Sequence, residues 1–172
     1  MHLRVRIALL VAAAIIVAAC SAGSTADDYF ADLAGATSSL DDALDEVEAS
    51  FNAGLLDINF EANGADQQFI DLFQASIGAV NEAFAGFAQG LSDLDPPPEL
   101  AAAHQEALDA GLSVVADYEA RSDQLGSIAT VADIDVYAEG LATSVARTRF
   151  VASCNELQEI ADRDRIEVDL SC

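Results

Sequence analysis

The fold is decided by residues 70–98, which read IDLFQASIGAVNEAFAGFAQGLSDLDPPP. Large apolar residues recur along this stretch in alternating steps of three and four. Such spacing is typical of an amphipathic helix that buries one face against its neighbours. The three prolines at 96–98 stop the helix, because each proline disfavours helical geometry in the residue before it. The apolar positions are Ile70, Phe73, Ile77, Val80, Phe84, Phe87, Leu91 and Leu94.

A preceding helix is predicted over residues 26–61 from the same three–four stepping. Its start carries Thr25 followed by Asp28, the spacing of a capping box. The dipeptide at 63–64, Asn-Gly, then breaks it, and we expect the next helix to begin near Asp66, which would cap it. The predicted core positions of this first helix are Phe30, Leu33, Thr37, Leu40, Leu44, Val47, Phe51, Gly54 and Ile58.

Two further helices are predicted after the prolines. One runs from Pro98, which suits a first helical position, to about residue 125. The other opens with Thr130 and Asp133 in capping-box spacing and ends near Arg163 or Arg165. The predicted core positions of the two are His104, Leu108, Gly111, Val115, Tyr118, Leu125, Ile134, Tyr137, Leu141, Val145, Val151, Cys154 and Leu157.

Four amphipathic segments separated by short breaks predict an all-α fold. Short connections favour antiparallel neighbours, so we expect a four-helix bundle with up-down-up-down topology. The tail at 166–170 alternates apolar and acidic residues and should lie extended against the bundle. Residues 26–172 are therefore predicted to form one acidic helical domain.

The first nineteen residues have the layout of a secretory signal. Arg4 and Arg6 precede an apolar stretch at 7–19 that ends in small residues. The stretch has about 13 residues, whereas a transmembrane helix needs about 20. We therefore expect residues 1–19 to be removed on export rather than retained as an anchor.

Residues 17–20, Val-Ala-Ala-Cys, resemble the lipobox of bacterial lipoproteins. The resemblance implies that Cys20 carries a diacylglycerol through a thioether and becomes the new N-terminus. Residues 20–25 then form a short, lipidated tether of small residues. An ordinary cleaved signal with an incidental cysteine is the alternative. The implied location is extracytoplasmic, with the protein held to a membrane by lipid on Cys20.

Composition excludes several classes of partner. The chain contains no lysine, and from Cys20 onwards it carries 30 acidic and 5 basic residues, a net charge of −25. Such a surface repels nucleic acid and anionic headgroups, so we expect no nucleic-acid partner. Its apolar content of 52% is too high for a disordered acidic chain.

If Cys20 is lipidated, Cys154 and Cys172 remain as a pair in an oxidising compartment. The extended tail can reach back along the last helix from Arg165 to Cys154, so we predict a Cys154–Cys172 disulfide. A redox-active pair is the alternative, but the two cysteines lack Cys-x-x-Cys spacing.

No catalytic or cofactor constellation stands out in the sequence. His104 is the one histidine after the leader, and its core position allows a metal or haem hypothesis. A diiron bundle needs paired Glu-x-x-His motifs, which are absent. We expect His104 to be a partly buried histidine at a bundle end, satisfied by a carbonyl or a carboxylate. The acidic cluster of Asp162, Asp164, Glu167 and Asp169 is interleaved with arginines, so a solvated helix end is favoured over a cation site. We predict no enzyme activity, no cofactor and no metal site.

The layout of lipobox, acidic alanine-rich helices, a Leu-Asp-Pro-Pro-Pro-Glu-Leu hinge at 94–100 and terminal cysteines is similar to helical envelope lipoproteins of high-GC bacteria. The resemblance implies placement in the envelope and no particular activity. The leading hypothesis is a non-catalytic binding or structural role, with an envelope protein as partner. The alternative is a ligand- or cation-binding domain that uses the bundle core or the acidic surface.

Overall fold

The computed structural model describes residues 24–170, which are all-helical and include no strand. The two helices expected before the prolines at 96–98 and the first helix expected after them are present. The C-terminal segment differs from the prediction. The helices are α2 (Ala26–Asp57), α3 (Ala65–Ser92), α4 (Ala101–Ala120), α5 (Ser122–Gly126), α6 (Val131–Ala142) and α7 (Val145–Asp164).

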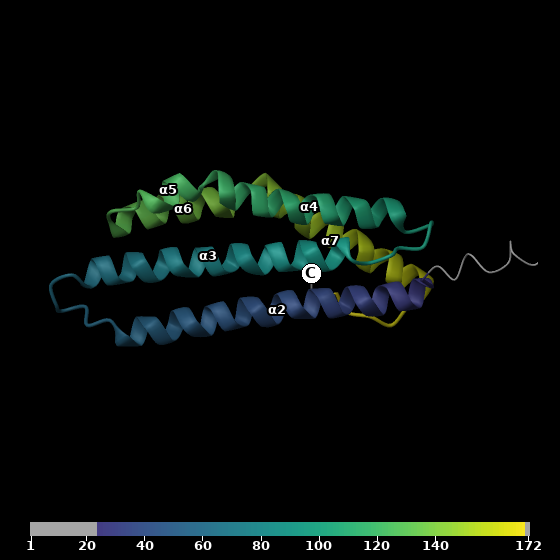
Figure 1. Cartoon of the computed structure of the whole chain (residues 1–172), viewed down its shortest axis with the longest axis horizontal. Coiled ribbons are helices and arrows are strands. Elements are labelled where there is room, and N and C mark those ends of the chain that lie inside the picture. Colours follow the sequence, from purple (N-terminus) through teal and green to yellow (C-terminus); the bar gives the residue numbers. More distant parts are fainter. Residues whose placement is uncertain (1–23, 171–172) are drawn as a thin grey trace, which may run out of the picture.

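Successive long helices lie side by side and reverse direction. In Figure 1, α3 lies between α2 on one side and α4 on the other. The α7 helix packs against α4, and α6 contacts α3. The connection between α2 and α3 lies at the far end of the molecule from the start of α2 (Figure 1).

The core is concentrated where α3, α4, α7 and the first half of α2 meet. All buried residues of α2 lie between Tyr29 and Leu40, and beyond Leu40 its residues are only half-buried or exposed. Phe150 of α7 packs edge-on against Phe84 and Phe87 of α3, with ring centroids 5.4 Å apart in both pairs. Edge-to-face packing suits the opposite partial charges of a ring's rim and face.

Both predicted capping boxes are confirmed. Thr25 Oγ1 accepts the N–H of Asp28 at 3.2 Å, while the Asp28 carboxylate accepts the N–H of Thr25. Thr130 and Asp133 repeat the arrangement at the start of α6. These hydrogen bonds lower the pKa of the Asp133 carboxyl below its ordinary value.

The connection between α2 and α3 is longer than predicted. The α2 helix ends at Asp57 rather than near residue 61, so Phe60 falls in the connection and is exposed. Gly64, with φ of 91°, precedes α3, and the predicted cap Asp66 lies inside the helix. Glycine adopts this left-handed conformation without the steric cost that a side chain would bring.

The predicted fourth helix is broken into α6 and α7. Ser144 is the N-cap of α7: its Oγ accepts the N–H of Arg147 and donates to the Asp117 carboxylate at 2.8 Å. The break changes the register, so the predicted core residues Val145 and Val151 are exposed. The residues of α7 that are buried are Ser153, Cys154, Leu157 and Ala161.

The third predicted helix also differs at its ends. It begins at Ala101 rather than Pro98, since residues 98–100 form a turn, and it is interrupted at Arg121 before α5. Within α4 the fully buried valine is Val114, and the predicted core residue Val115 is half-buried. The alanines of this helix supply the remaining contact, with Ala107 and Ala110 buried.

The chain after α7 folds back along that helix. Arg165 ends α7 in a left-handed conformation with φ of 62°, and the N–H of Ile166 donates to the carbonyl of Ala161. The side chain of Gln158 donates to the carbonyl of Val168 and accepts the N–H of Leu170. The tail at 166–170 therefore lies against α7, as expected, and Leu170 is buried.

Candidate binding groove between α2 and α3

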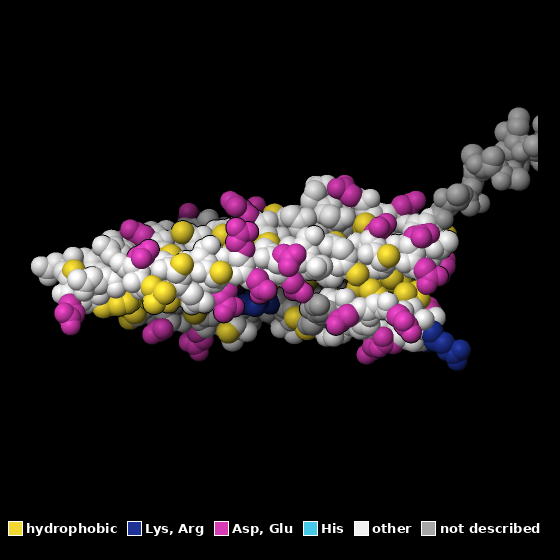
Figure 2. Space-filling model, turned by 90° about the horizontal axis from the view of Figure 1, so that it is seen from below, with side chains coloured by type: hydrophobic (Ala, Val, Ile, Leu, Met, Phe, Trp, Pro, Cys, Tyr) yellow, Lys and Arg dark blue, Asp and Glu magenta, His cyan; other side chains and the backbone are white. Residues whose placement is uncertain are grey.

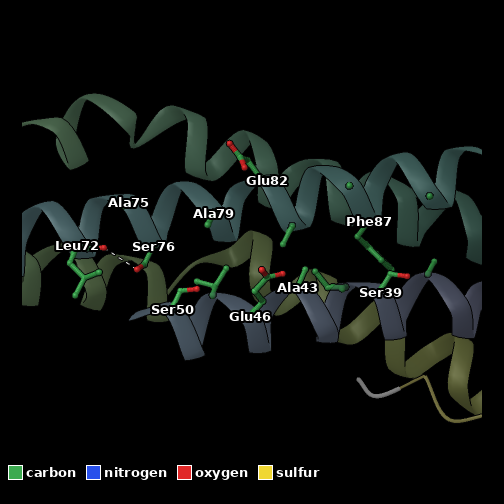
Figure 3. Close-up of a pocket in the computed structure, with 16 residues that line it drawn as sticks. Ser39, Ala43, Glu46, Ser50, Leu72, Ala75, Ser76, Ala79, Glu82 and Phe87 are labelled. Atoms are coloured by element: carbon green, nitrogen blue, oxygen red, sulfur yellow. Dashed lines mark hydrogen bonds between the residues drawn. The ribbon is translucent and has the colours of Figure 1, made fainter. Parts of the chain in front are cut away.

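An open groove of about 780 Å³ lies between α2 and α3. We call it the α2–α3 groove. Its larger apolar residues are Leu40 and Val47 of α2 and Leu72 and Phe87 of α3. In Figure 3, Leu72 and Phe87 project from α3 toward α2, and Glu46 reaches from α2 toward α3.

Small side chains produce this groove. Where two helices pack through Ala, Ser and Gly, little side-chain volume fills the surface between them. One helical face of each partner carries such residues at steps of three and four, so the hollow continues over several turns. The small lining residues are Ala36, Ser39, Ala43 and Ser50 of α2, and Ala75, Ser76, Ala79, Ala83, Gly86 and Gly90 of α3.

The helices approach each other unevenly along the groove. A Cβ built on Gly54 would lie 2.6 Å from Leu72 Cδ1, so α2 and α3 are in close contact at that end. No heavy atom of the described residues lies within 4 Å of a Cβ built on Gly86, so the groove wall is open there. Gly86 and Gly78 therefore face open space rather than a neighbouring helix. A Cβ built on Gly90 would lie 3.7 Å from Ala36 Cβ of α2, an ordinary packing distance.

The borders of the groove are acidic. Glu46 and Glu82 line it, and both are exposed. Figure 2 shows acidic side chains along the whole length of one face of the molecule, with hydrophobic groups between them toward both ends. At the end that carries the α2–α3 connection, Leu56 and Phe60 are 88% and 63% exposed. The groove thus combines an apolar floor with negatively charged borders.

His104 does not lie in the groove. It is buried in α4, and its Nδ1 lies 3.2 Å from the hydroxyl of Tyr29 in α2. Burial lowers the pKa of His104 and raises that of Tyr29 to about 12, so both are neutral at ordinary pH. His104 is more deeply buried than predicted, and its partner is a phenol rather than a carbonyl or carboxylate.

A second polar cluster lies where α4, α6 and α7 meet. The Asp117 carboxylate accepts hydrogen bonds from Arg121 Nε at 3.0 Å and from Ser144 Oγ. Tyr137 is fully buried nearby, and its hydroxyl has no hydrogen-bond partner among the described residues. Burial, Tyr118 and Asp117 raise the pKa of Tyr137. Neither Asp117 nor Tyr137 lines the groove. The hydrogen bond from Ser144 to Asp117 joins the break between α6 and α7 to α4.

The cysteine predictions fall mainly outside the described residues. Cys20 and Cys172 both lie there. Cys154 is buried in α7 and takes part in a disulfide. Its pairing with Cys172 remains a prediction, as does lipidation of Cys20.

Residues 24–170 include neither a cluster of metal-ligating side chains nor a membrane-spanning helix. No group of three or more His, Cys, Asp or Glu side chains there could hold a metal ion. In the same range, no helix combines the length and the apolar character that crossing a bilayer requires.

Comparison with known proteins yields no relative: no family model, curated protein or solved structure matches this chain. Function therefore has to be argued from the geometry alone. Sequence reasoning did not find the α2–α3 groove, because alanine and serine at helical spacing are equally typical of closely packed helices. The available signal was that small residues share one face on both helices of the same hairpin.

Proposed function

We propose that this chain is a lipid-anchored, extracytoplasmic helical protein with a non-catalytic binding role in the cell envelope, and that the α2–α3 groove is its binding surface. The observation that carries the proposal is the groove itself. An apolar floor held open between two long helices is the kind of surface into which a partner's side chains insert.

The position of the groove supports this role. Cys20 lies five residues before Thr25, the N-cap of α2. The groove begins at Ala36, about 15 Å along the helix from Ala26 at about 1.5 Å per residue, and continues away from that end. With Cys20 in the outer surface of a membrane, the groove would stand clear of the lipid. An envelope protein could then reach it.

The fold is proposed to be a four-helix bundle in which α6 and α7 together form the fourth segment. The reversal of direction from α2 to α3 to α4 supports up-down-up-down order (Figure 1). We further propose that a Cys154–Cys172 disulfide ties the tail to α7. The hydrogen bonds between Gln158 and residues 168 and 170 support it, because they already hold the tail alongside that helix.

A hydrophobic small molecule is the second candidate occupant. The volume of about 780 Å³ lies in the range of about 300–1,000 Å³ that is usual for ligand sites. Ligand binding would raise the melting temperature in proportion to the logarithm of ligand concentration. A long-chain alcohol is a suitable probe, because it carries no charge that Glu46 and Glu82 would repel. If the saturating alcohol leaves the melting temperature unchanged, this candidate fails.

The proposed role is tested by photocrosslinking in intact cells. A photoreactive residue replaces Ala43 on the groove floor in one variant and Glu48, which is exposed on the opposite side of α2, in the other. We expect a discrete crosslinked envelope protein from position 43 and none from position 48. Equal products from both positions would refute the groove as the binding surface.

Anchoring is tested separately with Cys20→Ser. We expect the wild-type chain in the membrane fraction, with the mass of a diacylated protein that starts at residue 20. The variant should lose the lipid mass and leave the membrane fraction. A wild-type chain that retains residues 1–19 and carries no acyl group would refute the anchor.

A further inference from the structure

The charges around the α2–α3 groove have a single sign. Residues 26–120 include no lysine or arginine, so no cationic side chain of the hairpin borders the groove. On α2, Asp42 and Asp32 precede Glu46 by about one and four turns and so share its side of the helix. On α3, Asp71 and Asp93 stand eleven residues before and after Glu82, about three turns each way. All six carboxylates are exposed.

From this arrangement we infer that the occupant of the groove is a basic amphipathic helix of a partner protein. The inference rests on the proposed function and specifies the chemistry of the partner. Apolar side chains on one face of the helix would insert between α2 and α3. Lysine or arginine on both flanks would lie against the acidic borders formed by Asp32, Asp42, Glu46, Asp71, Glu82 and Asp93.

The dimensions of the groove favour a helix of this kind. Its floor extends from Ala36 to Ser50 on α2, which is about 21 Å at about 1.5 Å per residue. A partner helix of about four turns covers that length, with apolar residues at i, i+3, i+4 and i+7 facing the floor. Small floor residues such as Ala43 and Ala79 leave room for the larger side chains of the incoming helix.

Charge argues against the other occupants. A second copy of this chain would bring the same acidic borders against Glu46 and Glu82, and like charges in juxtaposition oppose binding. An anionic lipid meets the same repulsion at its headgroup. A cationic helix instead gains from these borders, and its association should weaken as salt screens them.

The inference is tested with synthetic peptides and the full-length chain in nanodiscs of zwitterionic lipid. The probe is a fluorescent amphipathic helix of about four turns with leucine on one face and arginine on both flanks. A second peptide carries glutamate in place of every arginine. Fluorescence anisotropy is measured at low and at high salt, with empty nanodiscs as the blank.

Gly86→Leu places a large side chain at the groove wall, and its Cβ meets no heavy atom of the described residues within 4 Å. Gly78→Leu is the matched control: its Cβ is equally free, but Gly78 does not line the groove. We expect Gly86→Leu to weaken binding of the arginine peptide about tenfold or more, and Gly78→Leu to leave it within about twofold. Helical circular dichroism verifies that both variants fold.

A second pair of variants tests the charges. Glu46→Gln with Glu82→Gln should weaken binding of the arginine peptide and reduce its salt dependence, whereas Glu48→Gln with Glu61→Gln should do neither. Glu48 and Glu61 are exposed and do not line the groove. This pair keeps the inference testable even if Gly86→Leu fails to fold.

Three results would overturn the inference. The first is equal affinity of the groove for the arginine and the glutamate peptide. The second is displacement of the arginine peptide from the groove by phosphatidylglycerol vesicles. The third is a doubled mass of the chain in sedimentation that Gly86→Leu abolishes. Any of these identifies another occupant. If crosslinking from position 43 still captures an envelope protein while the arginine peptide fails to bind, the proposed function stands and only the chemistry of the partner is wrong.

Discussion

Replacing Tyr29 with phenylalanine should destabilise the protein by leaving His104 without its partner. Tyr29 and His104 are 1% and 6% exposed, and their polar atoms lie 3.2 Å apart, so water cannot readily replace the lost hydroxyl. An unsatisfied buried polar group costs about 1–3 kcal/mol. At about 2–4 °C per kcal/mol for a protein of this size, the melting temperature should fall by about 6 °C.

The double variant Tyr29→Phe with His104→Leu separates this hydrogen bond from packing. With both polar groups removed, no buried acceptor remains unpaired, and the cost should be smaller than the sum of the single variants by about 1 kcal/mol. Thermal unfolding of the four proteins measures this coupling. Strict additivity would show that the contact between Tyr29 and His104 contributes nothing.

The same pair sets two limits on the pH range of stability. Burial lowers the pKa of His104, so the unfolded chain binds more protons below about pH 6.5, and stability should fall as the pH drops below that value.

Burial raises the pKa of Tyr29 from 10.0 to about 12. The free energy of unfolding that depends on the neutral Tyr29 phenol is fully present below about pH 10. It is lost as the pH rises from 10 to 12, and the total loss is about 3 kcal/mol. Tyr29→Phe should remove the alkaline loss that this phenol causes. Unfolding curves with equal alkaline slopes in wild type and variant would contradict the assignment.

Four further variants test individual features by thermal unfolding. Gly78→Ala and Gly86→Ala should each raise the stability by about 1 kcal/mol, because alanine favours a helix and its methyl group meets no neighbour; a lower melting temperature would contradict the open space at these positions. Tyr137→Phe should be neutral or stabilising, since the hydroxyl that it removes is buried without a partner; a loss above about 1 kcal/mol would reveal a hydrogen bond that the structure lacks. Ser144→Ala should cost about 1–2 kcal/mol, because it removes the N-cap of α7 and a hydrogen bond to Asp117; an unchanged melting temperature would show that the helix break has another cause.

The helices were predictable where local chemistry determines them. The stepping of apolar residues located α2, α3 and α4, and the two Thr-x-x-Asp boxes fixed the first residues of α2 and α6. The break before Val145 was missed because Leu141 and Val145 preserve the apolar step of four. The relevant signal was Ser144, whose hydroxyl caps α7 and also donates to the Asp117 carboxylate of α4, a contact that the local sequence does not reveal.

The α2–α3 groove could not be predicted from one helix at a time. Its volume depends on how far apart α2 and α3 lie, and that separation is set by Leu72 against Gly54 at one end and by the core at the other. Glycine within a helix often lies where a neighbouring helix comes close, but Gly78 and Gly86 face open space. The buried His104 was predictable from its position on the core face, whereas its partner Tyr29 lies 75 residues away in the chain.

The central claim is that the α2–α3 groove binds a partner in the envelope. It is tested most directly by the yield of the crosslink from position 43 in cells that carry Gly86→Leu or Gly78→Leu. We predict that Gly86→Leu abolishes the crosslink while Gly78→Leu leaves it at the wild-type level. An undiminished crosslink in the Gly86→Leu cells would contradict the claim.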